Sequence, residues 1–200
     1  MVNEEYQGVD GLISLMHRLR QECEWDKAQT HESLVQYFIE ECFEVVDAIE
    51  TSDDQELKEE LGDVLLQVVF HSEIASQNGL FTINDVADTV IDKMIQRHPE
   101  VFAGAPKKYS SLEERERQWQ QDKRAEKAER RGPYDGIPAS LPALFQATKM
   151  IDRAQKLDAT LPEADDSLGA QLFTMVLSMH QQGHDPEAEL RSYLRQVRNS

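Results

Sequence analysis

Two acidic pairs separated by one short turn constrain the fold of this 200-residue chain more than any other feature. The pairs are Glu41-x-x-Glu44 and Glu60-x-x-Asp63. Residues three apart on a helix share a face, so each pair directs two carboxylates to the same side. If the two helices form an antiparallel hairpin, the four carboxylates converge. Two like charges about 4 Å apart repel by about 4 kcal/mol at an effective dielectric constant of about 20, so this arrangement requires a cation.

The residue types indicate which cation to expect. Carboxylate oxygens suit hard metal ions, and Mg²⁺ usually binds through a few carboxylates while substrate phosphates complete its shell. We therefore expect Mg²⁺, with Mn²⁺ as an alternative metal. The competing interpretation is a solvated acidic helix face. Lys58 is the only Lys or Arg between residues 28 and 92, so the cations that normally accompany such a face are missing.

The distribution of charge excludes several kinds of partner. Residues 1–100 contain 23 Asp and Glu against 6 Lys and Arg, whereas residues 101–200 contain 15 of each. The strongly negative residues 1–100 repel polyanions. We therefore expect the protein to bind neither nucleic acid nor a membrane. Cys23 and Cys42 form no metal-ligand or disulfide pattern, and the N-terminus has no apolar signal region. We expect a cytoplasmic protein.

The spacing of apolar residues predicts an all-α protein. Helical periodicity recurs along the chain, and no alternating strand pattern of useful length occurs. The sequence Ser52-x-x-Gln55 predicts a capping box for a helix that ends at Asn78-Gly79, while residues 23–30 are expected to be irregular. The run VLLQVVF within this helix is apolar nearly all round, which predicts burial on several sides and an oligomer of at least two copies.

Cations and aromatic residues at helical spacing suggest a nucleotide site. Lys93-x-x-x-Arg97 places two cations on one face, and Trp119-x-x-x-Lys123 places a ring beside a third. Trp25 is a further candidate wall for a base, although a Trp between helices is more often ordinary core. No P-loop, Rossmann fingerprint or Glu-x-x-His motif occurs, and His31, His71 and His98 lack the spacing of a transition-metal site.

At these residues the chain resembles a known family. The MazG family of nucleoside triphosphate pyrophosphohydrolases has a similar ordered set of motifs, which here read Trp25-Asp26-Lys27-x-Gln29-Thr30-His31-Glu32-Ser33, Glu40-Glu41-x-x-Glu44, Glu60-Leu61-Gly62-Asp63 and Lys93-x-x-x-Arg97-His98-Pro99-x-Val101-Phe102. One departure is Glu24, where the family commonly has Pro. The resemblance implies an all-α helical bundle that is obligately oligomeric, as a homodimer or a dimer of dimers.

The resemblance also implies the chemistry and the residues that carry it. It implies Mg²⁺-dependent cleavage of NTP or dNTP to the monophosphate and pyrophosphate, with broad, house-cleaning specificity. Glu40 or Glu41 would activate water. The metal ligands would be Glu41, Glu44, Glu60 and Asp63, and the substrate contacts Lys93, Arg97, Trp119 and Lys123, with Trp25 at the base. Two alternatives stay open: a non-catalytic acidic adaptor descended from such an enzyme, and a dUTP-preferring relative.

The remainder of the chain is expected to be an appendage. We expect a catalytic domain over residues 1–131, and a linker with a degenerate second copy over residues 132–200. Residues 167–173 echo residues 60–66, but Ser167 and Ala170 stand where the first copy has Glu60 and Asp63. Without these carboxylates the second copy cannot hold Mg²⁺, so we expect it to contribute packing or assembly and no chemistry.

Overall fold

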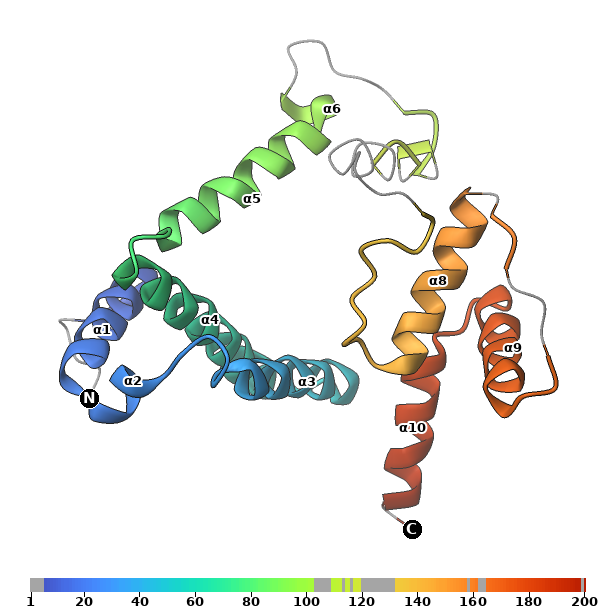
Figure 1. The fold of residues 1–200 in the computed structure, drawn as a ribbon, viewed down its shortest axis with the longest axis horizontal. Coiled ribbons are helices and arrows are strands. Elements are labelled where there is room, and N and C mark those ends of the chain that lie inside the picture. Colours follow the sequence, from blue (N-terminus) through green and yellow to red (C-terminus); the bar gives the residue numbers. More distant parts are fainter. Residues whose placement is uncertain are drawn as a thin grey trace. The chain divides into compact units, whose positions relative to one another are not determined.

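The computed structural model describes residues 6–102, 109–112, 114–115, 117–119, 132–157, 159–161, 165–198 and 200. Within these residues every regular element is a helix, which confirms the all-α prediction (Figure 1). The chain divides into two compact units, residues 1–111 and 112–200. None of the described helices is both long and apolar enough to cross a membrane.

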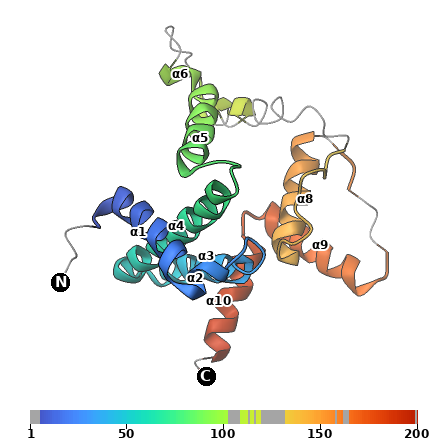
Figure 2. The same ribbon diagram turned by 60° about the vertical axis from the view of Figure 1, so that its left-hand side comes forward.

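The first unit is built on a helical hairpin. Its helices are α1 (Gly8–Glu22), α2 (Glu24–Ala28), α3 (Val35–Thr51), α4 (Asp54–Gln77), α5 (Ile83–Arg97) and α6 (Pro99–Phe102). The α3 and α4 helices lie side by side, and α1 packs on the C-terminal part of α4 (Figures 1 and 2). The small core between α1, the start of α3 and α4 consists of Met16, Leu34, Val69, Phe70 and Ile74. Burying each of the larger side chains stabilises the unit by about 1.5–3 kcal/mol.

The turn of the hairpin differs by one residue from the prediction. Ser52 adopts a left-handed conformation with φ of 58° and ends α3. The N-cap of α4 is Asp53, whose Oδ1 accepts hydrogen bonds of 3.0 Å from the backbone N–H groups of Gln55 and Glu56. The Ser52-x-x-Gln55 capping box is therefore wrong, because an N-cap needs the extended backbone that only Asp53 has here.

One arginine fixes the segment between α1 and α3. Residues 23–30 were expected to be irregular, but they contain the short helix α2. The Arg20 guanidinium donates to the backbone carbonyls of Asp26, Lys27 and Gln29, and also to Oε1 of Gln77 on α4 at 2.8 and 3.1 Å. Hydrogen bonds from all three nitrogens of one guanidinium thus attach α2 and the following turn to the C-terminal end of α4.

The α5 helix leaves the hairpin through a glycine turn. Gly79 follows α4 with φ of 68°, as expected for a helix C-terminus, and Thr82 and Asp85 form a capping box at the start of α5. Among the described helices, α5 contacts α4 and α6 but not α3. The last residues of α5 therefore extend away from the hairpin (Figures 1 and 2).

The second unit contains three longer helices, α8 (Ala143–Leu157), α9 (Leu168–Gln181) and α10 (Pro186–Arg198). Ile151, Ala154 and Val176 are buried between them, and His180 Nε2 lies 2.9 Å from Asp152 Oδ1. Residues 112, 114–115 and 117–119 are helical, and most of the other residues between 111 and 130 lie outside the described residues. The predicted domain boundary follows residue 131, which lies outside the described residues, while residue 132 is described.

The two units share one turn geometry. Asn78 (φ −87°, ψ 2°) and Gly79 (φ 68°) connect α4 to α5, while Gln182 (φ −87°, ψ 0°) and Gly183 (φ 82°) connect α9 to α10. The backbone hydrogen bonds agree as well, because the residue after each glycine donates to the carbonyl five positions earlier. This match is a second point of similarity beside the echo of residues 60–66 in residues 167–173.

Candidate active site

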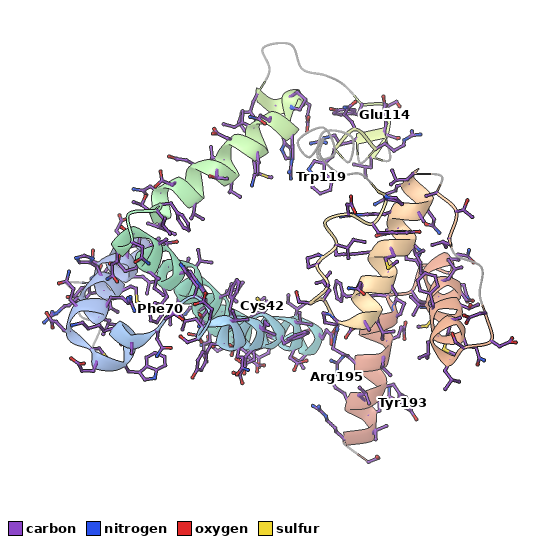
Figure 3. The ribbon with its side chains drawn as sticks, viewed as in Figure 1. Cys42, Phe70, Glu114, Trp119, Tyr193 and Arg195 are labelled. Carbon is purple, nitrogen blue, oxygen red and sulfur yellow. The ribbon has the colours of Figure 1, made fainter. Side chains whose placement is uncertain are left out.

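The α3–α4 hairpin brings the two acidic pairs together. One carboxylate oxygen from each of Glu41, Glu60 and Asp63 lies within 4.8 Å of the other two. Glu44 joins them through side-chain hydrogen bonds to Glu41 and to Glu60. We call these four residues the acidic cluster. Cys42, which follows Glu41 in the sequence, is labelled on α3 in Figure 3.

The electrostatics of the acidic cluster show that the carboxylates are crowded. Burial raises the pKa of Glu41 to about 7, with further contributions from the hydrogen bond to Glu44 and from the charges of Asp63, Glu44 and Glu60. The pKa of Glu60 is also raised, first by burial and then by the charge of Glu44. A shared proton and a shared cation are the two ways to relieve this repulsion. Because all the donors are carboxylate oxygens on two facing helices, the acidic cluster fits a hard divalent cation.

The comparisons with known proteins agree with this arrangement. A family model described as the MazG nucleotide pyrophosphohydrolase domain matches residues 29–102, which include the whole acidic cluster. The chain is 39% identical to the nucleoside triphosphate pyrophosphohydrolase/pyrophosphatase MazG of Thermotoga maritima, over 92% of this chain and 80% of that protein. The chain belongs to the MazG family. It is therefore a hydrolase of the nucleotide pyrophosphohydrolase class.

Other known proteins match this chain over shorter stretches. The nucleoside triphosphate pyrophosphohydrolase of Escherichia coli K12 is 42% identical over 150 residues, which are 72% of this chain and 56% of that one. Among solved structures, the crystal structure of a mazG-related protein from Thermotoga maritima has a TM-score of 0.49 and 26% identity, and covers 57% of this chain and 98% of that one.

Three other predicted site residues, Glu40, Lys93 and Arg97, lie outside the acidic cluster. Glu40 is exposed on α3 beside Glu41 and is not one of the three residues whose oxygens converge. Lys93 and Arg97 lie in the second half of α5, which makes no contact with α3 among the described residues. Within the described part of the chain, these two cations are therefore not grouped with the acidic cluster.

The predicted aromatic residues belong to two different parts of the chain. Trp25 is 53% exposed on α2, and its ring meets that of Tyr37 on α3 edge to face at 6.2 Å. Trp119 belongs to the second unit (Figure 3). Lys123 lies outside the described residues.

Sequence reasoning missed a group of polar side chains near the acidic cluster. His31 and His71 stack with their Nδ1 atoms 2.8 Å apart, and the ring of Phe38 meets that of His71 at 6.0 Å. Burial, followed by the charge of His31, lowers the pKa of His71. Gln67 lies between the acidic cluster and this pair along α4 and is only 6% exposed. In the sequence, this group was indicated only by Gln67, the single polar residue in the apolar run Val64–Phe70.

Proposed function

We propose that this MazG-family chain hydrolyses nucleoside triphosphates to nucleoside monophosphates and pyrophosphate, with Mg²⁺ held by Glu41, Glu44, Glu60 and Asp63. The acidic cluster carries the proposal, because four facing carboxylates with raised pKa values at Glu41 and Glu60 favour a divalent cation. The family membership supports the same class of reaction. Bound there, Mg²⁺ would neutralise negative charge on the phosphate oxygens of the substrate.

The residues of the chain perform the remaining steps. Water attacks the α-phosphorus, the bond from this phosphorus to the oxygen that bridges to the β-phosphorus breaks, and pyrophosphate leaves. Glu40 or Glu41 orients the water and accepts its proton.

Cations and aromatic rings complete the proposed substrate site. Lys93, Arg97 and Lys123 hold the departing pyrophosphate, where negative charge accumulates, and Trp119 and Trp25 contact the base. Because α5 does not contact α3 within one subunit, we propose that Lys93 and Arg97 reach the acidic cluster of a second copy. The proposed site is then complete only in the oligomer.

A product analysis in labelled water tests the reaction. The protein is incubated with Mg²⁺ and each canonical NTP and dNTP in H₂¹⁸O, and the products are resolved by mass spectrometry. We expect a monophosphate carrying one ¹⁸O atom and unlabelled pyrophosphate. Label in the pyrophosphate would place the attack at the β-phosphorus, and no turnover of any nucleotide would favour the adaptor alternative. Selective turnover of dUTP would favour the dUTP-preferring alternative.

We also propose that residues 132–200 supply no chemistry. The echo of the acidic cluster in α9 has Ser167 and Ala170 in place of two carboxylates, although the turn into α10 is preserved. A fragment of residues 1–131 should therefore keep the specific activity of the full chain in its folded fraction, with a lower melting temperature or an altered oligomeric state. A folded and correctly assembled fragment without activity would place an essential group within residues 132–200.

A further inference from the structure

The side chain of Gln67 is buried beside the acidic cluster without a protein partner. It lies one helical turn beyond Asp63 on α4, and residues at spacings of three and four share a helix face, so Glu60, Asp63 and Gln67 lie in line. Only 6% of Gln67 is exposed, and its Oε1 has no hydrogen-bond partner within the described part of the chain. Buried amide oxygens in proteins are nearly always hydrogen-bonded, so this atom points to a partner outside the described chain: a ligand, a water molecule or a second copy.

The register of the hairpin places carboxylates on one side of Gln67 and aromatic rings on the other. In the antiparallel hairpin, Glu41 on α3 lies level with Asp63 on α4, so Gln67 lies level with Tyr37 and Phe38. One turn further, His71 meets the Phe38 ring at 6.0 Å and the His31 ring at 5.1 Å. The hairpin therefore presents, in order, carboxylates, a buried amide and a group of rings.

We propose that Gln67 holds the nucleoside part of the substrate, accepting a hydrogen bond from an N–H or O–H of that group. This inference rests on the proposed function, in which the α-phosphate lies at the acidic cluster. Along α4, Gln67 lies about 6 Å and His71 about 12 Å beyond Asp63, which is the range over which a nucleoside extends from its α-phosphate. Ligand sites typically combine apolar and aromatic walls with a few polar groups that fix orientation.

The amide of Gln67 is able to present its oxygen to a ligand. Rotation of the amide by half a turn exchanges its oxygen and its nitrogen. No group in the described part of the chain donates a hydrogen bond to Oε1, so no such bond fixes the orientation of the amide. The oxygen can therefore turn to the small exposed edge of the side chain when a donor arrives there.

Binding of nucleoside monophosphates by the full-length protein, measured by calorimetry, tests the role of Gln67 without turnover. The variant Gln67→Leu is similar in size and removes the acceptor, and Gln55→Leu is a matched control at an exposed glutamine of the same helix. We expect Gln67→Leu to weaken monophosphate binding about fivefold to tenfold, and Gln55→Leu to leave it unchanged. In NTP hydrolysis, KM should rise in Gln67→Leu while kcat stays close to the wild-type value.

Changes in the ligand identify which donor Gln67 meets. Adenosine monophosphate is compared with purine riboside monophosphate, which lacks the amino group, and with 2′-deoxyadenosine monophosphate, which lacks the 2′-hydroxyl. The ligand that lacks the donor should bind wild-type protein more weakly and should bind wild type and Gln67→Leu equally well. If Gln67→Leu fails to fold, the comparison of ligands on the wild-type protein still tests the proposal. Gln67→Met is then a second apolar replacement.

The melting temperature separates this role from a merely structural one. If Gln67→Leu melts at a higher temperature and binds every monophosphate as the wild type does, Gln67 is only a buried polar residue and the proposal is overturned. A loss of the Mg²⁺-induced melting shift in Gln67→Leu would also overturn it, because Gln67 would then support the metal. If the wild type binds monophosphates through Gln67 but hydrolyses no NTP, the proposed function fails while the subsite stands.

Discussion

Glu41 shows most clearly how crowded the acidic cluster is. Its pKa rises from 4.5 to about 7, chiefly through burial and then through Glu44, Asp63 and Glu60. In the metal-free protein a large share of Glu41 is therefore protonated at neutral pH. Because a metal ion binds carboxylates in their deprotonated form, protons and Mg²⁺ compete for this residue.

The raised pKa of Glu41 predicts how stability depends on pH in the absence of metal. Between pH 4.5 and about 7 the folded state binds more protons at Glu41 than the unfolded state does, so the free energy of unfolding decreases as the pH rises through this range. Glu60 acts in the same direction. We expect the melting temperature in EDTA to fall more steeply with pH in wild type than in Glu41→Gln. Parallel curves for the two proteins would contradict this.

Removing one charge from the acidic cluster should separate activity from folding. Asp63→Asn and Glu44→Gln each weaken the metal site, but they also relieve repulsion between like charges. We expect loss of turnover, measured as pyrophosphate release, with an unchanged or slightly higher melting temperature in EDTA. Glu59→Gln, at an exposed position of α4 outside the acidic cluster, is the control and should retain activity. Near wild-type turnover in both cluster variants would refute the assigned metal roles.

At the scale of helices, bound Mg²⁺ would join α3 to α4. Both helices contribute two carboxylates to the acidic cluster, so a metal there binds the folded hairpin and not the unfolded chain. A ligand at 100 times its dissociation constant adds about 2.7 kcal/mol to stability, which corresponds to a rise of several degrees in melting temperature. Calorimetry with millimolar Mg²⁺ or Mn²⁺ measures the shift. No shift with either metal would count against the site.

The helices could be predicted from the sequence because each signal was local and repeated. The all-α class follows from helical periodicity, and the end of α4 at Asn78-Gly79 follows from a glycine that readily adopts a left-handed backbone. The cap of α4 was misplaced by one residue because Ser52 and Asp53 are both good N-caps. The left-handed backbone of Ser52, which the tight turn imposes, decided between them.

The site was predictable only where charge made it conspicuous. The four acids of the acidic cluster stand out because unmatched carboxylates at helical spacing have few structural explanations. Gln67 and the pair His31–His71 gave only weak signals, since a neutral polar residue in an apolar run and two histidines 40 positions apart acquire meaning through packing alone. The position of α5 relative to α3 likewise depends on tertiary contacts, which no local pattern encodes.

For the whole molecule, the exposed apolar side chains on α5 and α3 bear on how copies of the chain would assemble. Along α5, Val86, Val90, Ile91 and Met94 are 37–54% exposed, and on α3 Val35 and Ile39 are about half exposed. Residues 86, 90 and 94 follow one another at a spacing of four, so they form a stripe on one face of α5. Apolar faces of this kind usually mark an interface between proteins.

We expect these faces to be covered in a homodimer or a dimer of dimers. Sedimentation equilibrium at micromolar concentration measures the mass, and a monomer there would contradict the prediction. Val90→Glu, in the middle of the α5 stripe, should dissociate the oligomer because a charge at an interface is costly to desolvate. Asp88→Glu on the same exposed helix keeps the charge of its position and serves as the control.

The attachment of α2 by Arg20 has a consequence for cooperativity in unfolding. The segment around α2 has no buried residue of its own, and it is held to α1 and α4 largely by the hydrogen bonds of one guanidinium. Such a segment opens locally at a lower free energy than the hairpin does. Arg20→Lys keeps the charge but loses the fork of donors, so we expect faster hydrogen exchange at residues 26–29 and unchanged exchange in the middle of α4. Equal acceleration in both places would show that α2 and the hairpin unfold as one unit, so that the segment containing Trp25 could not open without disturbing the carboxylates.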